Sequence, residues 1–375
     1  MLRALAYFVG AVVVTAIVHA YLHRRLVRDA GFSSRVARVI TWALAALLPA
    51  GMIGLLMMRD APRALQAPVM WCAFVWIGAL GFLLPIVLAS EAVRPLPKSP
   101  ERRRALARIV GLAGGAATLA LGGASIAIAE MPLVVRRVRV RLPGLGASLR
   151  GYTIAQISDV HVSATIGRAR VEAIVAAVRA LAPDLVAVTG DLVDGSVPEL
   201  GPLLAPLGEL RAKDGVFFVT GNHEYLSGAE EWLAFLPSLG LRALRNERVA
   251  IGGEDGFDLI GVDDPSGSSW LPGHGTDLEA ATRGRDRARA SVLLAHRPDD
   301  VHDAAARGIG LQISGHTHGG QIEPVGWALE RMHQPYVCGL YEVGETVLYV
   351  TSGAGYWGPP MRLGTRAEIV LFELS

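Results

Sequence analysis

Cysteine is almost absent from this chain of 375 residues, which contains only Cys72 and Cys338. Cys72 lies in an apolar run and Cys338 lies far along the chain in a polar region, so we expect no disulfide between them. No Cys-x-x-Cys motif is present. The scarcity of cysteine argues against a structural zinc site made of thiolates, and it says nothing about the redox compartment.

Charge is also scarce, since charged residues make up 19% of the sequence and hydrophobic residues 51%. The net charge of +2 is too small to indicate a nucleic-acid-binding protein. Nearly all of the deficit in charge lies before Met131, which indicates two regions of different character in one chain. We expect a transmembrane helical region over residues 1–130 and a folded domain over residues 131–375.

Four long apolar stretches occupy the first region, and none has an acidic residue in its middle. A helix needs ~20 apolar residues to cross the hydrocarbon core of a membrane, so we expect about four transmembrane helices. A cleaved signal peptide is an alternative for the first stretch, but no small-x-small cleavage site follows it. The stretches are Leu5–Tyr21, Val36–Met58, Val69–Ser90 and Ala105–Ala129.

The positive residues predict an orientation in the cytoplasmic membrane. The loops after the first and third stretches are rich in arginine, whereas the loop after the second holds only Arg59 and Arg63. Cytoplasmic loops carry the excess of positive charge, so the domain after Ala129 is predicted on the extracytoplasmic side. The arginines from Arg136 to Arg141 oppose this orientation, unless the V-R-V-R alternation there is a half-buried strand. The two basic loops contain Arg24, Arg25, Arg28, Arg35 and Arg38, and Arg94, Lys98, Arg102, Arg103 and Arg104.

From Tyr152 onward, short apolar runs alternate with helical periods, which predicts an α/β layered fold. The later strands have fewer helices between them, which indicates a second sheet that is mixed or antiparallel. The expected strands are 153–157, 185–189, 216–220, 257–261, 291–295, 310–313, 347–351 and 367–373, and the main expected helices are 168–181, 200–211 and 229–239.

Polar clusters follow five of these strands directly, at the strand ends where open α/β sheets hold their ligands. Each cluster is weak evidence alone, but together they contain five of the ten histidines of the chain. The clusters are Ser158-Asp159-Val160-His161, Gly190-Asp191-Leu192-Val193-Asp194, Gly221-Asn222-His223-Glu224, His296, and Ser314-Gly315-His316-Thr317-His318-Gly319-Gly320.

The donors in these clusters indicate a metal centre. Carboxylate, imidazole and amide oxygen suit divalent manganese, iron or zinc. Seven donors are more than one ion needs, and they suit two ions that share one carboxylate and activate a hydroxide for in-line attack at phosphorus. The candidate metal ligands are Asp159, His161, Asp191, Asn222, His296, His316 and His318. His302 competes with His296, but only His296 directly ends an apolar strand.

The series D-x-H, G-D-x-x-D, G-N-H-E, a lone H and G-H-T-H resembles the calcineurin-like metallophosphoesterase superfamily. The resemblance covers about Val134 to Ser375. The segments Gly315–Gln321, Pro335-Tyr336 and Gly339-Leu340-Tyr341 resemble its membrane-attached bacterial subgroup, typified by the YkuE and YaeI proteins. The resemblance implies a four-layer α/β/β/α sandwich preceded by the transmembrane helices.

The resemblance also implies a role for each residue. One ion is expected on Asp159, His161, Asp191 and His318, and the second on Asp191, Asn222, His296 and His316, with Asp191 bridging. His223 is expected to donate a proton to the leaving oxygen or to stabilise developing charge. Glu224 is expected to orient His223, and Asp194 to anchor its loop. Trp357 and Arg362 are interpreted as surface packing residues.

The sequence therefore predicts a membrane-anchored phosphoesterase with two divalent ions that hydrolyses phosphate mono- or diesters, with lipid and cell-envelope phosphoesters as candidate substrates. No basic, aromatic-rich groove is evident, so nucleic acid is not expected as a partner. Two alternatives stay open. One is a nuclease-like enzyme that acts on soluble substrates from a membrane tether, and the other is a catalytically weak binding module.

Overall fold

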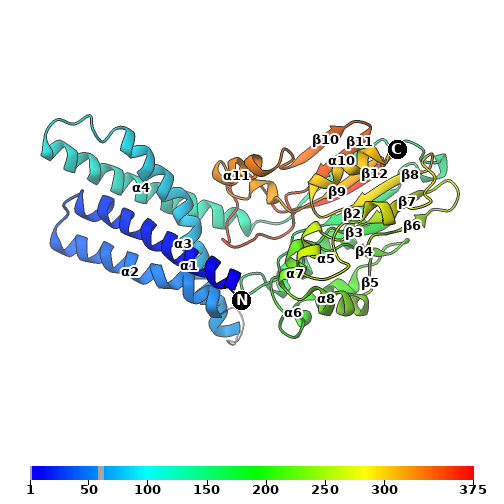
Figure 1. The fold of residues 1–375 in the computed structure, drawn as a ribbon, viewed down its shortest axis with the longest axis horizontal. Helices are drawn as coiled ribbons and strands as arrows, with labels where there is room; N and C mark the ends of the chain where they lie inside the picture. The colour runs from blue at the N-terminus through cyan, green and yellow to red at the C-terminus, as the bar shows by residue number, and fades with distance from the viewer. Residues whose placement is uncertain (1, 58–62) are drawn as a thin grey trace. The chain divides into compact units, whose positions relative to one another are not determined.

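The computed structural model describes residues 2–57 and 63–375 and divides into two compact units (Figure 1). The first unit comprises Met1–Ala127 together with Gly358–Met361, and the second comprises Ile128–Trp357 and Arg362–Ser375. We call them the helical unit and the α/β unit.

The described part of the helical unit consists of long antiparallel helices, and short turns connect the first helix to the second and the third to the fourth. Each apolar stretch of the sequence coincides with one helix over nearly all of its described residues, although Met58 lies outside the described residues and Ser90 begins a short turn. Many apolar side chains point outward, for example Ile17, which is 62% exposed, and Leu119, which is 80% exposed. The helices and short turns are α1 (Leu2–His23), η1 (Arg24–Arg28), α2 (Ser34–Met57), α3 (Arg63–Ala89), η2 (Ser90–Ala92) and α4 (Pro100–Ala129).

Two helices in the described part of the chain are long and apolar enough to cross a membrane. These segments are Leu65–Ala92 and Pro100–Ala129. Outward-facing apolar side chains on helices of this length are typical of a membrane environment. The expectation of four spanning helices goes beyond this finding.

The α/β unit contains two six-stranded mixed sheets in the described residues. The strand order is β1-β12-β2-β3-β4-β5 in the first sheet and β10-β11-β9-β8-β7-β6 in the second. The first sheet has β1 (Val134–Val140), β2 (Thr153–Ile157), β3 (Leu185–Val188), β4 (Val216–Phe218), β5 (Leu241–Ala243) and β12 (Glu368–Leu374). The second has β6 (Glu247–Ile251), β7 (Phe257–Gly261), β8 (Ala290–Leu294), β9 (Leu311–Ser314), β10 (Gly339–Val343) and β11 (Thr346–Val350).

Short helices connect the strands. The α-helices are α5 (Arg168–Leu181), α6 (Val197–Leu204), α7 (Asn222–Leu226), α8 (Ala229–Phe235), α9 (Leu278–Thr282), α10 (Val301–Ala306) and α11 (Val325–His333). Single 3-10 turns are η3 (Ala147–Leu149), η4 (Ala205–Glu209), η5 (Leu236–Leu239), η6 (Pro265–Ser269), η7 (Pro298–Asp300) and η8 (His318–Gly320).

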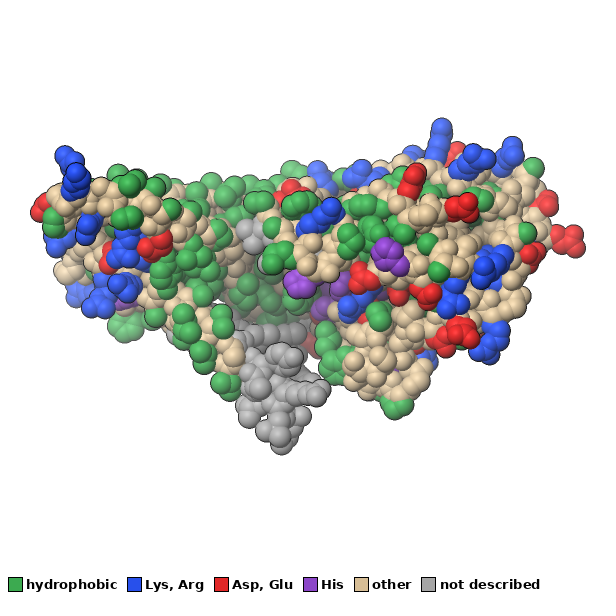
Figure 2. Space-filling view, turned by 45° about the horizontal axis from the view of Figure 1, so that its top comes forward, with side chains coloured by type: hydrophobic (Ala, Val, Ile, Leu, Met, Phe, Trp, Pro, Cys, Tyr) green, Lys and Arg blue, Asp and Glu red, His purple; other side chains and the backbone are tan. Residues whose placement is uncertain are grey.

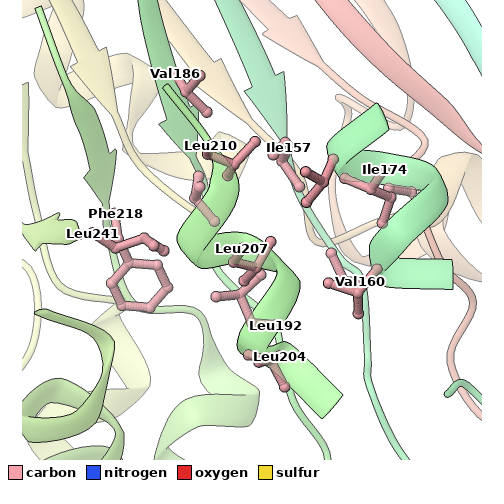
Figure 3. Packing of buried hydrophobic residues seen from close by; sticks show 14 of the residues in the cluster. Ile157, Val160, Ile174, Val186, Leu192, Leu204, Leu207, Leu210, Phe218 and Leu241 are labelled. Atoms are coloured by element: carbon pink, nitrogen blue, oxygen red, sulfur yellow. The ribbon is translucent and has the colours of Figure 1, made fainter. Parts of the chain in front are cut away.

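The apolar core explains why these segments take these forms. Strands β2 and β3 are buried on both faces, which is why their sequences are nearly continuous apolar runs rather than alternating ones. One face of each packs between the two sheets, where Leu185 shares a cluster with Leu259 and Val292. The other face packs against helices, as Figure 3 shows for Ile157 beside Ile174 of α5.

Helix α5 shows how the sequence specifies this packing. Val171, Ile174, Val175 and Val178 recur at the helical period, and all four are buried. The predicted bounds of α5, β2 and β7 agree with the structure, and the second sheet is mixed as expected. Strands β5, β6 and β10 were not predicted, and each lies at the edge of a sheet.

Candidate metal centre

The five polar clusters come together at the carboxyl ends of the strands that precede them, which are β2, β3, β4, β8 and β9. Backbone hydrogen bonds join the loops, with the Asp159 N–H donating to Gly190 O at 3.0 Å and the Gly315 N–H donating to His296 O at 2.9 Å. The buried Gln156 amide links the sheets by donating to Ser314 O at 3.0 Å. Loops from both sheets therefore build one site.

One group of possible ligands consists of Asp159, His161 and His318, all of them buried. His318 Nε2 lies 3.0 Å from His161 Nε2 and 3.6 Å from Asp159 Oδ1. Asp159 Oδ2 is buried and has no hydrogen-bond partner among the described residues. A buried carboxylate oxygen without a donor is costly, so this corner of the site is suited to a cation.

A second group consists of Asp191, His296 and His316. Asp191 Oδ2 lies 3.1 Å from His296 Nε2, and His316 Nδ1 lies 3.2 Å from the same His296 nitrogen. Asn222 precedes His223, whose N–H donates to Asp191 Oδ1 at 2.8 Å. The side-chain oxygen of Asn222 is buried without a partner among the described residues.

Asp191 lies between the two groups, because its Oδ2 is also 3.6 Å from His161 Nε2. The same oxygen therefore approaches one histidine from each group. Its other oxygen, Oδ1, is held by the His223 N–H, which leaves Oδ2 directed at the histidines.

The hydrogen bonds of His296 and His161 show why a cation fits. His296 Nδ1 is 2.8 Å from the carbonyl of Thr189, so it must carry a proton, and a neutral ring then directs a lone pair from Nε2 at the Asp191 carboxylate. His161 Nδ1 donates in the same way to Asp194 Oδ1 at 3.1 Å. A divalent cation at Nε2 would take the place of the proton that this nitrogen otherwise shares with Asp191, and fixing the second ring nitrogen is how proteins orient metal-binding histidines.

The pKa shifts of the histidines differ from one ring to the next. Burial opposes charge on His296, but the Asp191 carboxylate outweighs it and raises the pKa of His296 to about 10. Burial lowers the pKa of His316 to about 3, and it also lowers the pKa of His318. His316 and His318 are therefore neutral at pH 7 and have lone pairs available.

The backbone around the site is strained. Asp159, His161, Asp191, His316 and His318 all have φ between 50° and 75°, a region that side-chain-bearing residues seldom occupy. Such conformations cost about 1–3 kcal/mol each and persist where the surroundings enforce them, typically at functional sites. All five are candidate ligands in the sequence.

Two glycines of the motifs are required by close approach. A Cβ on Gly221 would lie 2.1 Å from Asp191 Oδ1, and a Cβ on Gly315 would lie 2.1 Å from Asp159 Oδ2. Any side chain at these positions would displace a candidate ligand. The glycines of G-N-H-E and G-H-T-H therefore make room for the carboxylates.

Asp194 orients His223, a role expected of Glu224 from the motifs. His223 Nδ1 donates to Asp194 Oδ1 at 2.6 Å, and the same oxygen accepts from His161. Burial disfavours charge on His223, but the bond to Asp194 and the Asp191 charge prevail and raise its pKa to about 9. The two histidines hold the pKa of Asp194 below its ordinary value, although burial alone would raise it.

Glu224 instead organises the loops. Its fully buried carboxylate accepts from three backbone N–H groups, those of Gly221 at 2.7 Å, Asp191 at 2.9 Å and Leu192 at 2.7 Å. Burial, with the nearby Asp191 charge, raises the pKa of Glu224 to about 7. Glu224 was expected to orient the His223 ring, but in the structure its carboxylate oxygens are directed at backbone N–H groups instead.

The interpretation of Arg362 as a surface residue is wrong. Its side chain is fully buried, and its guanidinium donates to Gly355 O at 2.6 Å and to Ser352 O at 2.6 Å. Trp357 is 55% exposed, and its ring centre is 5.6 Å from that of His223. His302 hydrogen-bonds Tyr336 at 3.3 Å and belongs to none of the ligand groups found among the described residues.

Comparisons with known proteins agree with this geometry. A model of the calcineurin-like phosphoesterase family matches residues 152–320. A "transmembrane protein with metallophosphoesterase domain" from Bos taurus is 40% identical over 76% of this chain and 66% of its own length. An uncharacterized metallophosphoesterase of Helicobacter pylori strain J99 is 34% identical over 81% of this chain and 80% of its own.

The uncharacterized metallophosphoesterase YkuE of Bacillus subtilis is 27% identical over 74% of this chain and 99% of its own length. The resemblance drawn from the motifs is thereby confirmed. The chain spans no more than about two thirds of the length of the vertebrate relatives that it matches.

Proposed function

The chain belongs to the calcineurin-like phosphoesterase family, and from this premise we propose that it is a membrane-anchored phosphoesterase that holds two divalent cations and hydrolyses phosphate mono- or diesters. The observation that carries the proposal is the position of Asp191 Oδ2, which lies 3.1 Å from His296 Nε2 and 3.6 Å from His161 Nε2. One carboxylate oxygen between two ligand groups is what a pair of ions requires.

The ligands would be divided as the motifs suggest. Asp159, His161, Asp191 and His318 would hold one ion, and Asp191, Asn222, His296 and His316 the other. When bound, the ions would supply Lewis acidity toward the phosphoryl oxygens and lower the pKa of water at the site. Manganese, zinc and iron all suit this donor set.

His223 would act on the leaving group. Its pKa of about 9 keeps it protonated at neutral pH. Nδ1 donates to Asp194, so Nε2 is the atom that would give its proton to the departing oxygen. Asp194 would fix the ring orientation and stabilise its positive charge. Glu224 would act indirectly, by holding the backbone on both sides of Asp191 and next to Asn222.

The membrane part of the proposal rests on two observations. Two described helices are candidate spans, and the bovine relative is described as a transmembrane protein. We propose residues 1–130 as a multi-pass membrane region with four spanning helices, and residues 131–375 as an extracytoplasmic catalytic domain of four layers. Attachment to a bilayer favours lipid or cell-envelope phosphoesters as the physiological substrates.

The test uses the full chain in detergent, freed of metal and then loaded with Mn²⁺ or Zn²⁺. Bound metal is measured by mass spectrometry, and hydrolysis is measured with p-nitrophenyl phosphate and bis-p-nitrophenyl phosphate. We expect about two ions per chain, metal-dependent turnover, and a preference for one ester class. Asp191→Asn should lose metal and activity together, whereas His302→Ala, outside the ligand groups, should retain both. A folded, metal-loaded protein without turnover would support the binding-module alternative instead.

A further inference from the structure

A cavity in the helical unit is lined by none of the residues of the metal centre. It has a volume of about 570 Å³ and lies where the α1–α2 turn meets the segment between α3 and α4. In Figure 2, charged side chains of this unit gather at one end, and apolar side chains cover most of the rest. The charged residues that line the cavity are Arg25, Arg28, Arg94, Arg103, Arg104 and Asp29.

The walls of the cavity are held together by ion pairs between the two segments. Arg25 pairs with Glu91 at 2.8 Å, and Arg94 pairs with Asp29 at 3.2 Å. Arg94 also pairs with Glu91 at 3.3 Å. Two arginines and two carboxylates, one of each from either segment, therefore neutralise one another and fix the shape of the cavity.

Three arginines remain after this pairing. Arg28, Arg103 and Arg104 line the cavity, and none of them forms an ion pair with an acidic residue in the part of the chain that the structure describes. All three are exposed at the cavity mouth. Three like charges around one cavity repel one another, so an anion bound there would be stabilised.

Two further features favour a phosphate group. Helix α4 begins at Pro100, which lines the cavity, and the N-terminus of a long helix carries partial positive charge that favours anions. Arginine is suited to phosphate because its planar fork donates two parallel hydrogen bonds. The cavity also has an apolar wall, made of Leu106, Ala107 and Val110.

We propose that this arginine cavity binds a phosphate-bearing anion, and that the anion is the headgroup of an anionic lipid. The apolar wall beside the charged rim fits a headgroup with an acyl chain better than it fits a free ion. Basic pockets between membrane helices are a recognised means of binding anionic lipid headgroups. The lipid source depends on the proposed membrane location, whereas phosphate recognition does not.

The test measures binding to the full chain in a non-ionic detergent, made metal-free by dialysis so that no ester is cleaved. Three probes are titrated: short-chain phosphatidylglycerol, short-chain phosphatidylcholine and inorganic phosphate. We expect phosphatidylglycerol to bind most tightly. Replacing Arg28, Arg103 and Arg104 together by glutamine should weaken its binding roughly a hundredfold, the effect of removing three charges near a membrane surface.

A matched variant with the same change of charge serves as the control. Arg35, Arg38 and Arg102 belong to the same unit, are exposed, and do not line the cavity. Their joint replacement by glutamine should leave the dissociation constant nearly unchanged. Melting temperatures without ligand establish that both variants are folded, and Arg104→Gln alone replaces the triple variant if that protein is unstable.

Each outcome decides the proposal. If inorganic phosphate binds as tightly as the lipid, and this binding is lost in the cavity variant, the cavity is a phosphate site whose ligand is a free anion. Equal lipid binding by wild type and cavity variant would overturn the proposal, as would equal losses in the two triple variants. The measurement is independent of turnover, so a failed hydrolysis assay leaves it intact.

Discussion

Replacing Asp194 by asparagine should weaken proton donation to the leaving group, and this defect should grow as the pH rises. In the structure Asp194 Oδ1 accepts from His223 at 2.6 Å and from His161 at 3.1 Å. Asparagine retains an acceptor oxygen but loses the negative charge. Together with the Asp191 charge, that charge keeps His223 protonated, so the pKa of His223 should fall from about 9 toward its ordinary value of 6.5.

The size of the effect follows from the fraction of His223 that carries a proton. At pH 8, a pKa of about 9 leaves roughly 90% of the imidazole protonated, and a pKa near 6.5 leaves roughly 3%. The loss from protonation is then at most about 30-fold at pH 8, and less than about twofold at pH 6. The sign is fixed, because a general acid loses activity as the pH rises through its pKa.

The assay is kcat/KM against pH for two diesters, one with an aryl leaving group and one with an alkyl leaving group. Alkoxide leaves poorly without a proton, so the alkyl ester should show the full defect and the aryl ester much less. Asp303→Asn, an exposed aspartate on α10, is the control and should behave as wild type. The roles given to Asp194 and His223 would be refuted if the decline of kcat/KM at alkaline pH occurred at the same pH in the variant as in wild type. They would also be refuted if kcat/KM fell equally for both esters.

The remaining predictions concern the metal centre and its support. Asp191→Asn should lower metal occupancy and reduce turnover at least about a hundredfold. Metal analysis measures the occupancy, and full restoration of activity by excess Mn²⁺ would argue against a bridging role. Glu224→Gln should destabilise the protein by about 1–3 kcal/mol, because an amide has one acceptor oxygen for three backbone N–H groups, and an unchanged melting temperature would contradict this. Arg362→Met should lower the free energy of unfolding by about 1–3 kcal/mol for each carbonyl left without a donor. The soluble yield and the melting temperature should both fall, and a variant as stable as wild type would mean that water replaces the guanidinium.

Patterns of short range were enough to predict most of the fold. Helix α5 follows from one apolar face repeated at the helical period, and β2 and β7 follow from apolar runs bounded by polar residues. The strands that were not predicted, β5, β6 and β10, are three of the four edge strands, where exposed residues such as Glu247 interrupt the pattern. An edge strand is specified by the partner it pairs with, and that partner is distant in sequence.

The site divides in the same way. The residue types and the strand ends at which they lie are properties of the sequence, because parallel strands bring their carboxyl ends to one edge of a sheet. The direction in which each side chain points does not follow from these sequence properties. Asp194 and Glu224 are both acidic residues near His223 in the motifs, and only the folded loops decide that Asp194 contacts the imidazole while Glu224 faces three backbone N–H groups.

The apolar helical region, the α/β domain and the nitrogen and oxygen donors suited to divalent metals could all be predicted from the order of the amino acids. Those features depend on composition, period and motif, which local chemistry specifies. Tertiary structure alone decided that Arg362 is buried beneath the site and that arginines of two separate loops surround one cavity. Both depend on segments far apart in the chain, whose approach is fixed by packing and pairing rather than by neighbouring residues.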